Sequence, residues 1–285
     1  MGTNEAETQC CLGRGRGGGA RGDAGCGTRA AEGAGEKAAG VVDHGEAILA
    51  ALTRAGDRAD EIGSAQVEMT TELGMGGAPI AMDGTYSWGD GYAYDVQMDT
   101  KASQMQTLQD DPTIRTLFVD GAYYYDVDPQ PSGPLAGKEW MKVDASAMLG
   151  EQGAQALSGS SGSPTASLKG LKYADDVDDL GTETVEGKHT THYQATIDQS
   201  RMGRFKDALG DESGILGSVT GGVNSISVDI WVGDDDLPVR ILQTMGAMKV
   251  TIDFEKFGAT TEVKAPPAAQ TGDLTEAIKE AGAAQ

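Results

Sequence analysis

Basic residues are scarce in this sequence. Of its 285 residues, 22 are Lys or Arg and 44 are Asp or Glu, so the formal net charge is −22. Binding to nucleic acid requires clustered Lys and Arg against the phosphates, and docking on anionic lipid headgroups requires a similar basic patch. The charge balance therefore argues against both kinds of partner. A net charge this far from zero keeps a protein soluble and favours a monomer.

Cysteine is absent after the first 26 residues. The three cysteines are Cys10, Cys11 and Cys26, so no disulfide framework can hold the fold of the later chain. Long hydrophobic runs are absent too. No stretch of about 18 apolar residues could form a membrane-spanning helix. Residues 1–40 hold no apolar run of about 7–15 residues that would mark a signal peptide.

The first 42 residues form a segment of their own. They are rich in Gly, Ala and Arg and have no apolar period, which predicts disorder. Ala24-Gly25-Cys26 has the small-small-Cys ending of a lipoprotein cleavage site, although Asp23 stands where an apolar residue is expected. Cys26 is therefore a candidate lipidation site. We interpret residues 1–42 as a tether, or as the product of a wrong start or reading frame in front of the domain.

A folded pattern begins at residue 43. Asp43 with Glu46 fits a helix N-cap, and this helix is expected to end near Gly63. From Ser64 apolar and polar residues alternate, which is typical of strands with one buried face. Hairpin signals such as Asp120-Gly121 recur along the chain. Together they predict about nine antiparallel strands, with two or three helices between them, two of which are expected near residues 145–157 and 200–209.

A wide antiparallel sheet of this kind is expected to curl. Helices placed between its strands would cover one face, which gives an α+β fold. One domain is predicted over residues 43–267, because Pro266-Pro267 closes the pattern. Residues 268–285 are predicted to be a flexible C-terminal tail with a weak helix near residues 274–278.

Residues suited to catalysis or metal binding are few. His189 and His192 are the close histidine pair, and on a strand residues three apart point to opposite faces, so they cannot share a metal ion there. Asp234, Asp235 and Asp236 offer oxygen ligands that suit calcium, but their spacing fits a solvated hairpin tip better. No nucleophile elbow, phosphate loop or dinucleotide fingerprint occurs. The sequence predicts no enzyme, no metal and no cofactor.

A hydrolase is the third hypothesis. Glycoside hydrolysis needs only two carboxylates, and acidic residues are abundant in this chain. However, aromatic residues make up only 5% of the sequence, so no sugar-binding platform of aromatic rings supports this reading.

The alternating segments leave a set of apolar side chains that would line one or the other face of the curved sheet. Methionine is frequent, with 11 residues, and its flexible side chain suits adaptable apolar pockets. Either these residues are ordinary core, or they line a cavity for an apolar ligand. The cavity candidates are Val67, Met69, Ile80, Met82, Tyr94, Val96, Met98, Val228, Ile230, Ile241, Val250 and Ile252.

Several segments, in their order and spacing, resemble the LppX/LprG-type lipoproteins of actinobacteria, which are similar in fold to the LolA lipoprotein carrier. The segments are Phe118–Tyr125, Gly137–Asp144, Gly181–Gly187 leading to His192-Tyr193, and Ile230–Val232 followed by Leu237–Arg240. The resemblance covers about residues 47–267. It implies a half-barrel of antiparallel strands with helices packed on the concave face, and between them a cavity for acyl chains of lipids or lipoglycans.

The resemblance also implies an exported protein that is not an enzyme and is tethered to the membrane by a lipidated N-terminal cysteine. The leading hypothesis is thus a lipid-binding or lipid-carrying lipoprotein on the outer face of the cell membrane. The alternative is a non-catalytic structural or sensory envelope module, in which side chains fill the half-barrel and the acidic surface binds a protein partner. Cavity volume separates the two hypotheses.

Overall fold

The computed structural model describes residues 32–74, 77–158, 163–171, 174, 176–198, 225–258 and 260–283. The chain divides into two compact units, Met1–Val41 and Val42–Gln285. Helix α1 (Glu32–Ile62) begins at Glu32 rather than near the predicted Asp43, so residues 32–42 are helical where disorder was predicted. Residues 1–31, with the lipidation candidate Cys26, lie outside the described residues, and so does a helix predicted over residues 200–209.

Twelve strands of the second unit form one sheet, in the order β12-β6-β5-β4-β3-β2-β1-β11-β10-β9-β8-β7. Their bounds are β1 (Ser64–Glu72), β2 (Ile80–Ser87), β3 (Ala93–Asp99), β4 (Thr113–Val119), β5 (Ala122–Asp126), β6 (Trp140–Asp144), β7 (Asp176–Val185), β8 (Lys188–Asp198), β9 (Ser225–Gly233), β10 (Pro238–Met245), β11 (Met248–Phe257) and β12 (Thr271–Asp273). All neighbours are antiparallel except β12 and β6, which are parallel.

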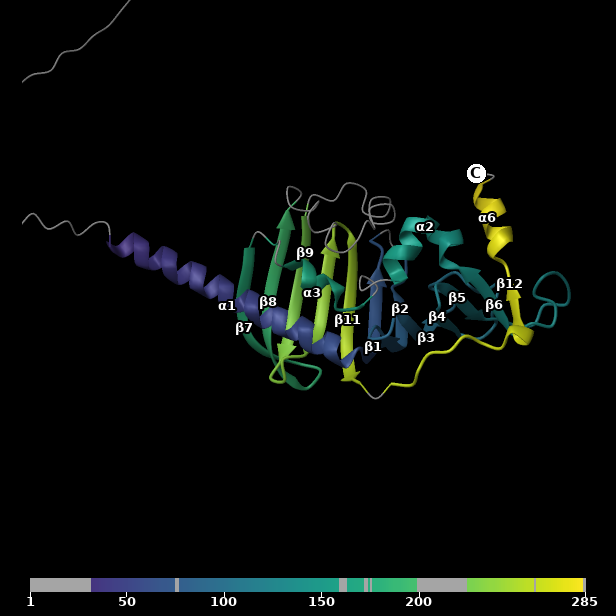
Figure 1. Cartoon of the computed structure of the whole chain (residues 1–285), viewed down its shortest axis with the longest axis horizontal. Coiled ribbons are helices and arrows are strands. Elements are labelled where there is room, and N and C mark those ends of the chain that lie inside the picture. The colour runs from purple at the N-terminus through teal and green to yellow at the C-terminus, as the bar shows by residue number, and fades with distance from the viewer. Residues whose placement is uncertain are drawn as a thin grey trace, which may run out of the picture. The chain divides into compact units, whose positions relative to one another are not determined.

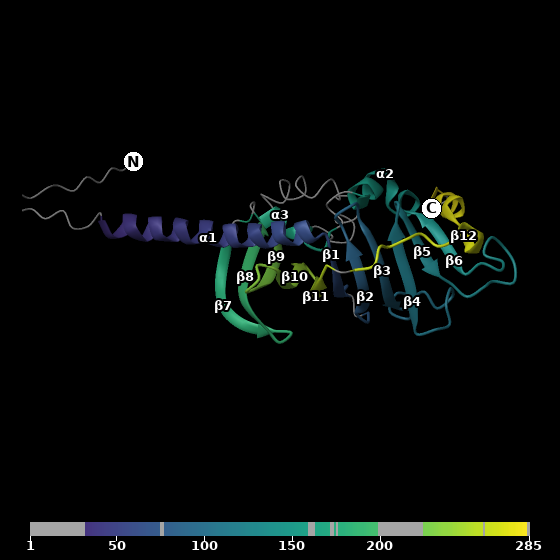
Figure 2. The same ribbon diagram turned by 60° about the horizontal axis from the view of Figure 1, so that its bottom comes forward.

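The sheet is curved and open, and short helices lie on one side of it (Figures 1 and 2). The predicted fold class, an α+β half-barrel of antiparallel strands, is confirmed. The structure has more strands than the nine or so that were predicted. Within the described residues, the helices besides α1 are α2 (Ala145–Ser158), α3 (Ala166–Gly170), the 3₁₀ turn η3 (Ala268–Gln270) and α6 (Thr275–Ala283).

Tight turns set the register of the hairpins. In the β4–β5 turn Asp120 and Gly121 have φ of 54° and 74°, and in the β7–β8 turn Glu186 and Gly187 have φ of 49° and 74°. Two consecutive residues with positive φ define a type I′ turn, whose twist matches that of the flanking strands. The dipeptides therefore fix which residues pair, and with them which side chains share a face.

The two faces of the sheet differ in polarity because the strands alternate. On β1, for example, Val67 and Met69 point to one face, while Gln66 and Glu68 point to the other. We call the first side the apolar face and the second the polar face. The helices pack on the apolar face through Ile48, Leu52 and Ala55 of α1, Leu168 of α3 and Leu171 just after it, Ala147 of α2, and Leu274 and Ile278 near the chain's end.

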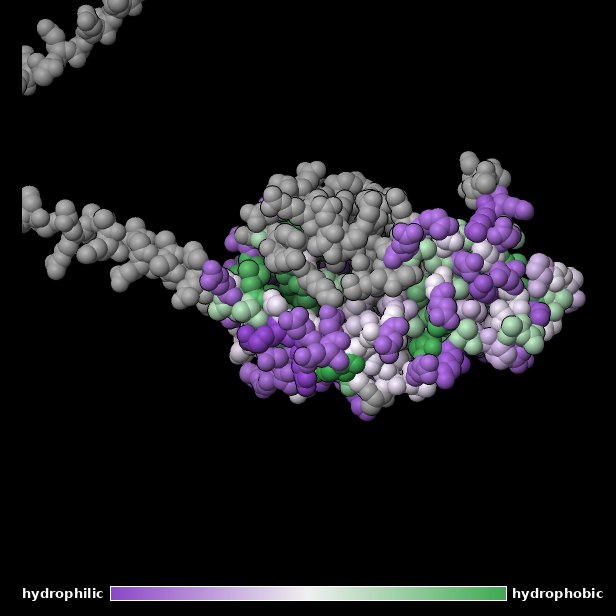
Figure 3. All heavy atoms as spheres, viewed as in Figure 1, coloured by the Kyte–Doolittle hydropathy of each residue, from purple (hydrophilic) through white to green (hydrophobic). Residues whose placement is uncertain are grey.

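The outward side of α1 is hydrophilic, with exposed Arg54, Asp57, Arg58 and Glu61. In the space-filling view this side is purple, and hydrophobic surface appears in patches beside it (Figure 3). The helix therefore separates the apolar face of the sheet from water, as its pattern of residues predicts.

The C-terminal segment differs from the flexible tail predicted over residues 268–285. Residues 260–267 run across the polar face, where Val263 packs against Leu117 and Tyr124 (yellow in Figure 2). Then β12 pairs with β6, and the Lys142 Nζ lies 3.0 Å from Asp273 Oδ2. The domain thus extends to α6 rather than ending at residue 267. A sequence as short as Thr-Gly-Asp carries no period, so the pairing had no local signal.

The start of α6 is fixed by hydrogen bonds. The Asp144 N–H donates to Thr275 Oγ1 (3.0 Å), and the Thr275 N–H donates to Asp273 Oδ1 (2.9 Å). Partial burial acts to raise the pKa of Asp273, but the hydrogen bonds from Thr275 and Lys142 outweigh it and hold the pKa at about 2. Asp273 is therefore ionised at neutral pH and keeps the C-terminal segment on the sheet.

Candidate functional site

The strand register places all twelve predicted cavity residues on the apolar face. One row across the sheet runs Ile230, Ile241, Ile252, Met69, Met82, Met98. A second row joins Val228, Gln243, Val250, Thr71 and Ile80, and a third contains Val67 and Val96 on either side of Gly84. Tyr94, two residues before Val96 on β3, lies on the same face.

Seven of the twelve are packed core. Their exposed fractions are 9% for Met98 and at most 3% for the others, which are Val67, Val96, Val228, Ile230, Ile241 and Ile252. The other five, Met69, Ile80, Met82, Tyr94 and Val250, are only partly buried. We call these five the apolar strip. They lie on β11, β1, β2 and β3, the four central strands of the sheet.

The apolar strip lies where two packed clusters meet. One cluster joins α1 and α3 to strands β1–β3 and β8–β11, and contains Met69, Tyr94 and Val250 at its margin. The other joins α2 and α6 to β3–β6 and contains Ile80 at its margin. Met82 belongs to both. The five side chains of the strip therefore keep part of their surface exposed.

A row of aromatic rings continues the strip across β2–β5. Ring centroids are 5.5 Å apart for Tyr86 and Tyr94, 5.8 Å for Tyr94 and Phe118, 4.9 Å for Phe118 and Tyr123, and 6.3 Å for Tyr123 and Tyr125. These spacings are typical of packed aromatic pairs. Of the row, only Tyr94 was among the predicted residues. Tyr123 and Tyr125 belong to the Phe118–Tyr125 segment that carries the family resemblance, and strand alternation after the turn at Asp120 would have placed both on this face.

No charge is present along this part of the apolar face. The inward positions of β1–β6 and β9–β11 hold no Asp, Glu, Lys, Arg or His. Burial raises the pKa of the Tyr94, Tyr86 and Tyr123 phenols well above 10, and it raises the pKa of Tyr125 to about 12. The phenols therefore stay neutral at physiological pH, and the face suits uncharged, apolar molecules.

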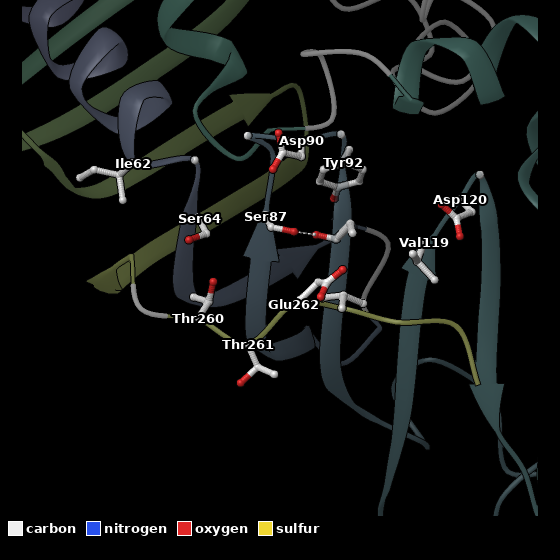
Figure 4. A pocket seen from close by; sticks show the side chains of 16 residues that line it. Ile62, Ser64, Ser87, Asp90, Tyr92, Val119, Asp120, Thr260, Thr261 and Glu262 are labelled. Carbon is white, nitrogen blue, oxygen red and sulfur yellow. Dashed lines mark hydrogen bonds between the residues drawn. The ribbon is translucent and has the colours of Figure 1, made fainter. Parts of the chain in front are cut away.

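Two hollows lie elsewhere, beside residues 260–264. The larger, about 670 Å³, lies at the ends of the central strands and is lined by hydroxyls and carboxylates, including Ser64, Asp90, Asp120 and Glu262 (Figure 4). The Ser87 hydroxyl there donates to the Ala93 carbonyl at 3.5 Å. The smaller, about 440 Å³, lies on the polar face beside the Arg115–Asp95 ion pair. Of the twelve predicted residues, Val96 alone lines either hollow.

The histidines bind different partners. His189 Nδ1 lies 3.1 Å from Asp234 Oδ1 at the exposed β9–β10 turn. His192 Nε2 lies 3.0 Å from Asp229 Oδ1, and its ring stacks on Trp231 with centroids 4.1 Å apart. Within the described residues, no group of three or more His, Cys, Asp or Glu side chains is placed to hold a metal ion. None of the described helices is long and apolar enough to cross a membrane.

Two curated proteins of Streptomyces are similar in sequence. An uncharacterized 31.2 kDa protein of Streptomyces griseus is 26% identical over 82% of this chain and 82% of its own. A putative lipoprotein of Streptomyces coelicolor is 28% identical over 77% of this chain and 73% of its own. No family model matches the chain.

Among solved structures, LprF of Mycobacterium bovis shares the fold, and the Mycobacterium tuberculosis lipoprotein LppX aligns less closely. LprF of Mycobacterium bovis superposes with a TM-score of 0.51 at 12% identity, over 77% of this chain and 97% of its own. LppX of Mycobacterium tuberculosis superposes with a TM-score of 0.49 at 14% identity, over 77% of this chain and 99% of its own. The resemblance that the sequence motifs predicted is confirmed at the level of the fold.

Proposed function

Because the chain has the fold of the LppX/LprG-type, LolA-like lipoproteins, we propose that it is a non-catalytic lipoprotein that binds lipid acyl chains on its apolar face. The observation that carries this proposal is the apolar strip. It offers partly buried Met, Ile, Val and Tyr side chains on four adjacent central strands, whose inward positions hold no charged residue. Folded proteins usually bury such a surface, unless a ligand or partner covers it.

The binding mechanism is physical rather than chemical. Each methylene group that leaves water for an apolar site gains roughly 0.8 kcal/mol, so a long acyl chain binds without any polar recognition motif. Met69 and Met82, which face each other across β1 and β2, have flexible side chains that adapt to the chain's shape. The neutral phenols beside them tolerate the ester or hydroxyl oxygens of a lipid.

The proposal includes a cellular location. The similar protein of Streptomyces coelicolor is a putative lipoprotein, which supports a site on the outer face of the cell membrane. The anchor would be a lipidated cysteine near the N-terminus, for which Cys26 is the candidate in this sequence. The net charge of −22 supports a monomer.

The second candidate function is a structural or sensory envelope module that binds a protein partner. The observation in its favour is that seven of the twelve predicted cavity residues are packed core, so side chains fill much of the sheet's apolar face. A partner would then meet the acidic outer surface.

We expect the double substitution Met69→Gln with Met82→Gln to weaken binding of a fluorescent fatty acid at least tenfold. Glutamine keeps the length of methionine but places an unpaired amide against the acyl chain, which costs about 1 kcal/mol or more at each position. The measurement is a fluorescence titration of the purified protein, with thermal unfolding recorded for each variant.

Met148→Gln is the matched control. Met148 lies on α2 and is 50% exposed, so the same chemical change outside the apolar strip should leave the dissociation constant unchanged. If the wild-type protein does not bind the probe, or if the double variant binds it as tightly, the acyl-chain site is not on this face.

A further inference from the structure

The two ends of the sheet differ in charge. At one end, the turns carry exposed acids: Asp90 between β2 and β3, Asp120 between β4 and β5, Glu186 between β7 and β8, and Asp234–Asp236 between β9 and β10. At the opposite end, the β1–β2 and β10–β11 connections carry no charge. The sequence has no charged residue from Leu73 to Met82, and none between Arg240 and Lys249. In a chain of net charge −22, two connections without a charged residue at the same end of the sheet require an explanation.

The two uncharged connections touch each other. A Cβ placed on Gly74 would lie 2.4 Å from the Cβ of Ala247, so the two turns are in close contact. Leu73 is 46% exposed although it is a large hydrophobic residue, and Gly77, Ala78, Pro79, Gly246 and Ala247 are exposed as well. We call Leu73, Gly74, Gly77–Pro79, Gly246 and Ala247 the uncharged rim.

The uncharged rim leads directly onto the apolar strip. Thr71 pairs with Ile80 on one side and with Val250 on the other, and these are the first strip residues below the rim. Met69 and Met82 form the next row. A lipid acyl chain that entered from the rim would therefore meet apolar side chains without passing a charged residue.

We propose that the uncharged rim docks into the surface of a lipid bilayer, so that acyl chains pass between the membrane and the apolar strip. This inference rests on the proposed acyl-chain function. Apolar insertion rather than charge attraction would hold the contact, because the rim has no cation to bind anionic headgroups. Leu73 would enter the interface, and the small Gly and Ala residues around it let the two turns approach the bilayer closely.

The distribution of acids fits this orientation. Strand β1 has 9 residues, so the acidic turns lie roughly 30 Å from the rim at about 3.3 Å per residue. Charge interactions are screened over about 8 Å at physiological ionic strength. The acidic end would therefore stay out of reach of an anionic membrane surface. Two other connections within the described residues lie at the rim end: the β3–β4 loop carries Lys101, Asp110 and Asp111, and the β5–β6 loop carries Asp128, Lys138 and Glu139. Each of these loops adds a net charge of only one acid.

The test is flotation of the full-length, unlipidated protein with phosphatidylcholine vesicles, with and without phosphatidylglycerol. We expect the wild-type protein to bind both, and the Leu73→Glu, Ala247→Glu double variant to bind at least tenfold more weakly, since a buried leucine gains about that factor or more from leaving water. Leu180→Glu is the matched control. Leu180 lies on the edge strand β7 and is 52% exposed, yet it is distant in the sheet order from the rim, so its variant should bind like wild type.

Binding of a fluorescent fatty acid in solution, without vesicles, separates the two proposals. If the rim proposal is right, the double variant binds the free fatty acid as wild type does and transfers it to vesicles more slowly. The proposal is overturned if the wild type does not float with vesicles, or if the double variant and the Leu180→Glu variant float equally. Failure of the wild type to bind the free fatty acid would instead overturn the proposed function, whatever the vesicles show.

Discussion

Ile230→Asp should strongly destabilise the domain. Ile230 lies on the apolar face of β9, is 0% exposed, and faces Ile241 and Tyr193 on the neighbouring strands. The substitution removes a packed aliphatic side chain and buries a carboxylate without a partner, since no cation lies on this face of β9–β11. Together these effects cost more than about 4 kcal/mol. Single domains are stable by about 5–15 kcal/mol, so the substitution removes a large share of the free energy of unfolding and should lower the urea midpoint far below that of wild type.

Urea unfolding followed by circular dichroism measures this effect, and Ile230→Val is the control. Shortening the side chain by one methyl group should cost about 1 kcal/mol and leave a cooperative transition. If the aspartate variant unfolds with a midpoint near that of wild type, Ile230 does not lie in a packed core, and the assignment of the apolar face is wrong for β9.

Gly84→Ala is expected to have the second-largest effect. Gly84 lies in the middle of β2, and a Cβ there would be 2.1 Å from the carbonyl oxygen of Asp95 and 2.8 Å from the Cα of Val96. Both atoms belong to the backbone of β3, so no side chain can move aside. The two strands must separate, at a cost of about 3 kcal/mol.

Gly77→Ala is the matched control, because a Cβ at Gly77 meets nothing within 4 Å. Thermal unfolding should show a lower midpoint for Gly84→Ala and little change for Gly77→Ala. Equal midpoints for the two variants would mean that β2 and β3 are not as close at Gly84 as the register requires.

The sequence was sufficient to predict which strand residues form an apolar set, but not that the set shares one face of the sheet, nor how deeply each residue is buried. Alternation assigned Val67, Met69, Met82 and Ile230 to an apolar set, and turns such as Asp120-Gly121 fixed the pairing that brings this set onto one face. Whether a residue is packed or partly exposed depends on where the helices lie on that face. Val67 lies in the cluster under α1, whereas Met82 lies at the margin between two clusters. No local sequence pattern distinguishes the buried Val67 from the partly exposed Met82.

Long-range contacts explain why the sequence predicted neither the pairing of β12 nor the hollow in Figure 4. The pairing of β12 with β6 joins residues about 130 positions apart through the Lys142–Asp273 ion pair and the Asp144–Thr275 hydrogen bond. The hollow in Figure 4 likewise combines strand ends such as Ser64 and Ser87 with Thr260–Val263. Each segment is unremarkable by itself, so only the folded topology brings these groups together.

Mass spectrometry of the protein purified from its native host, without detergent, tests the central claim most directly. Denaturing spectra give the mass of the polypeptide with any covalently attached lipid, and native spectra give the mass with everything that remains bound. We expect the native mass to exceed the denatured mass by that of at least one acyl lipid, which solvent extraction then recovers. Equal native and denatured masses, with no lipid in the extract and no uptake of an added fatty acid, would contradict the account.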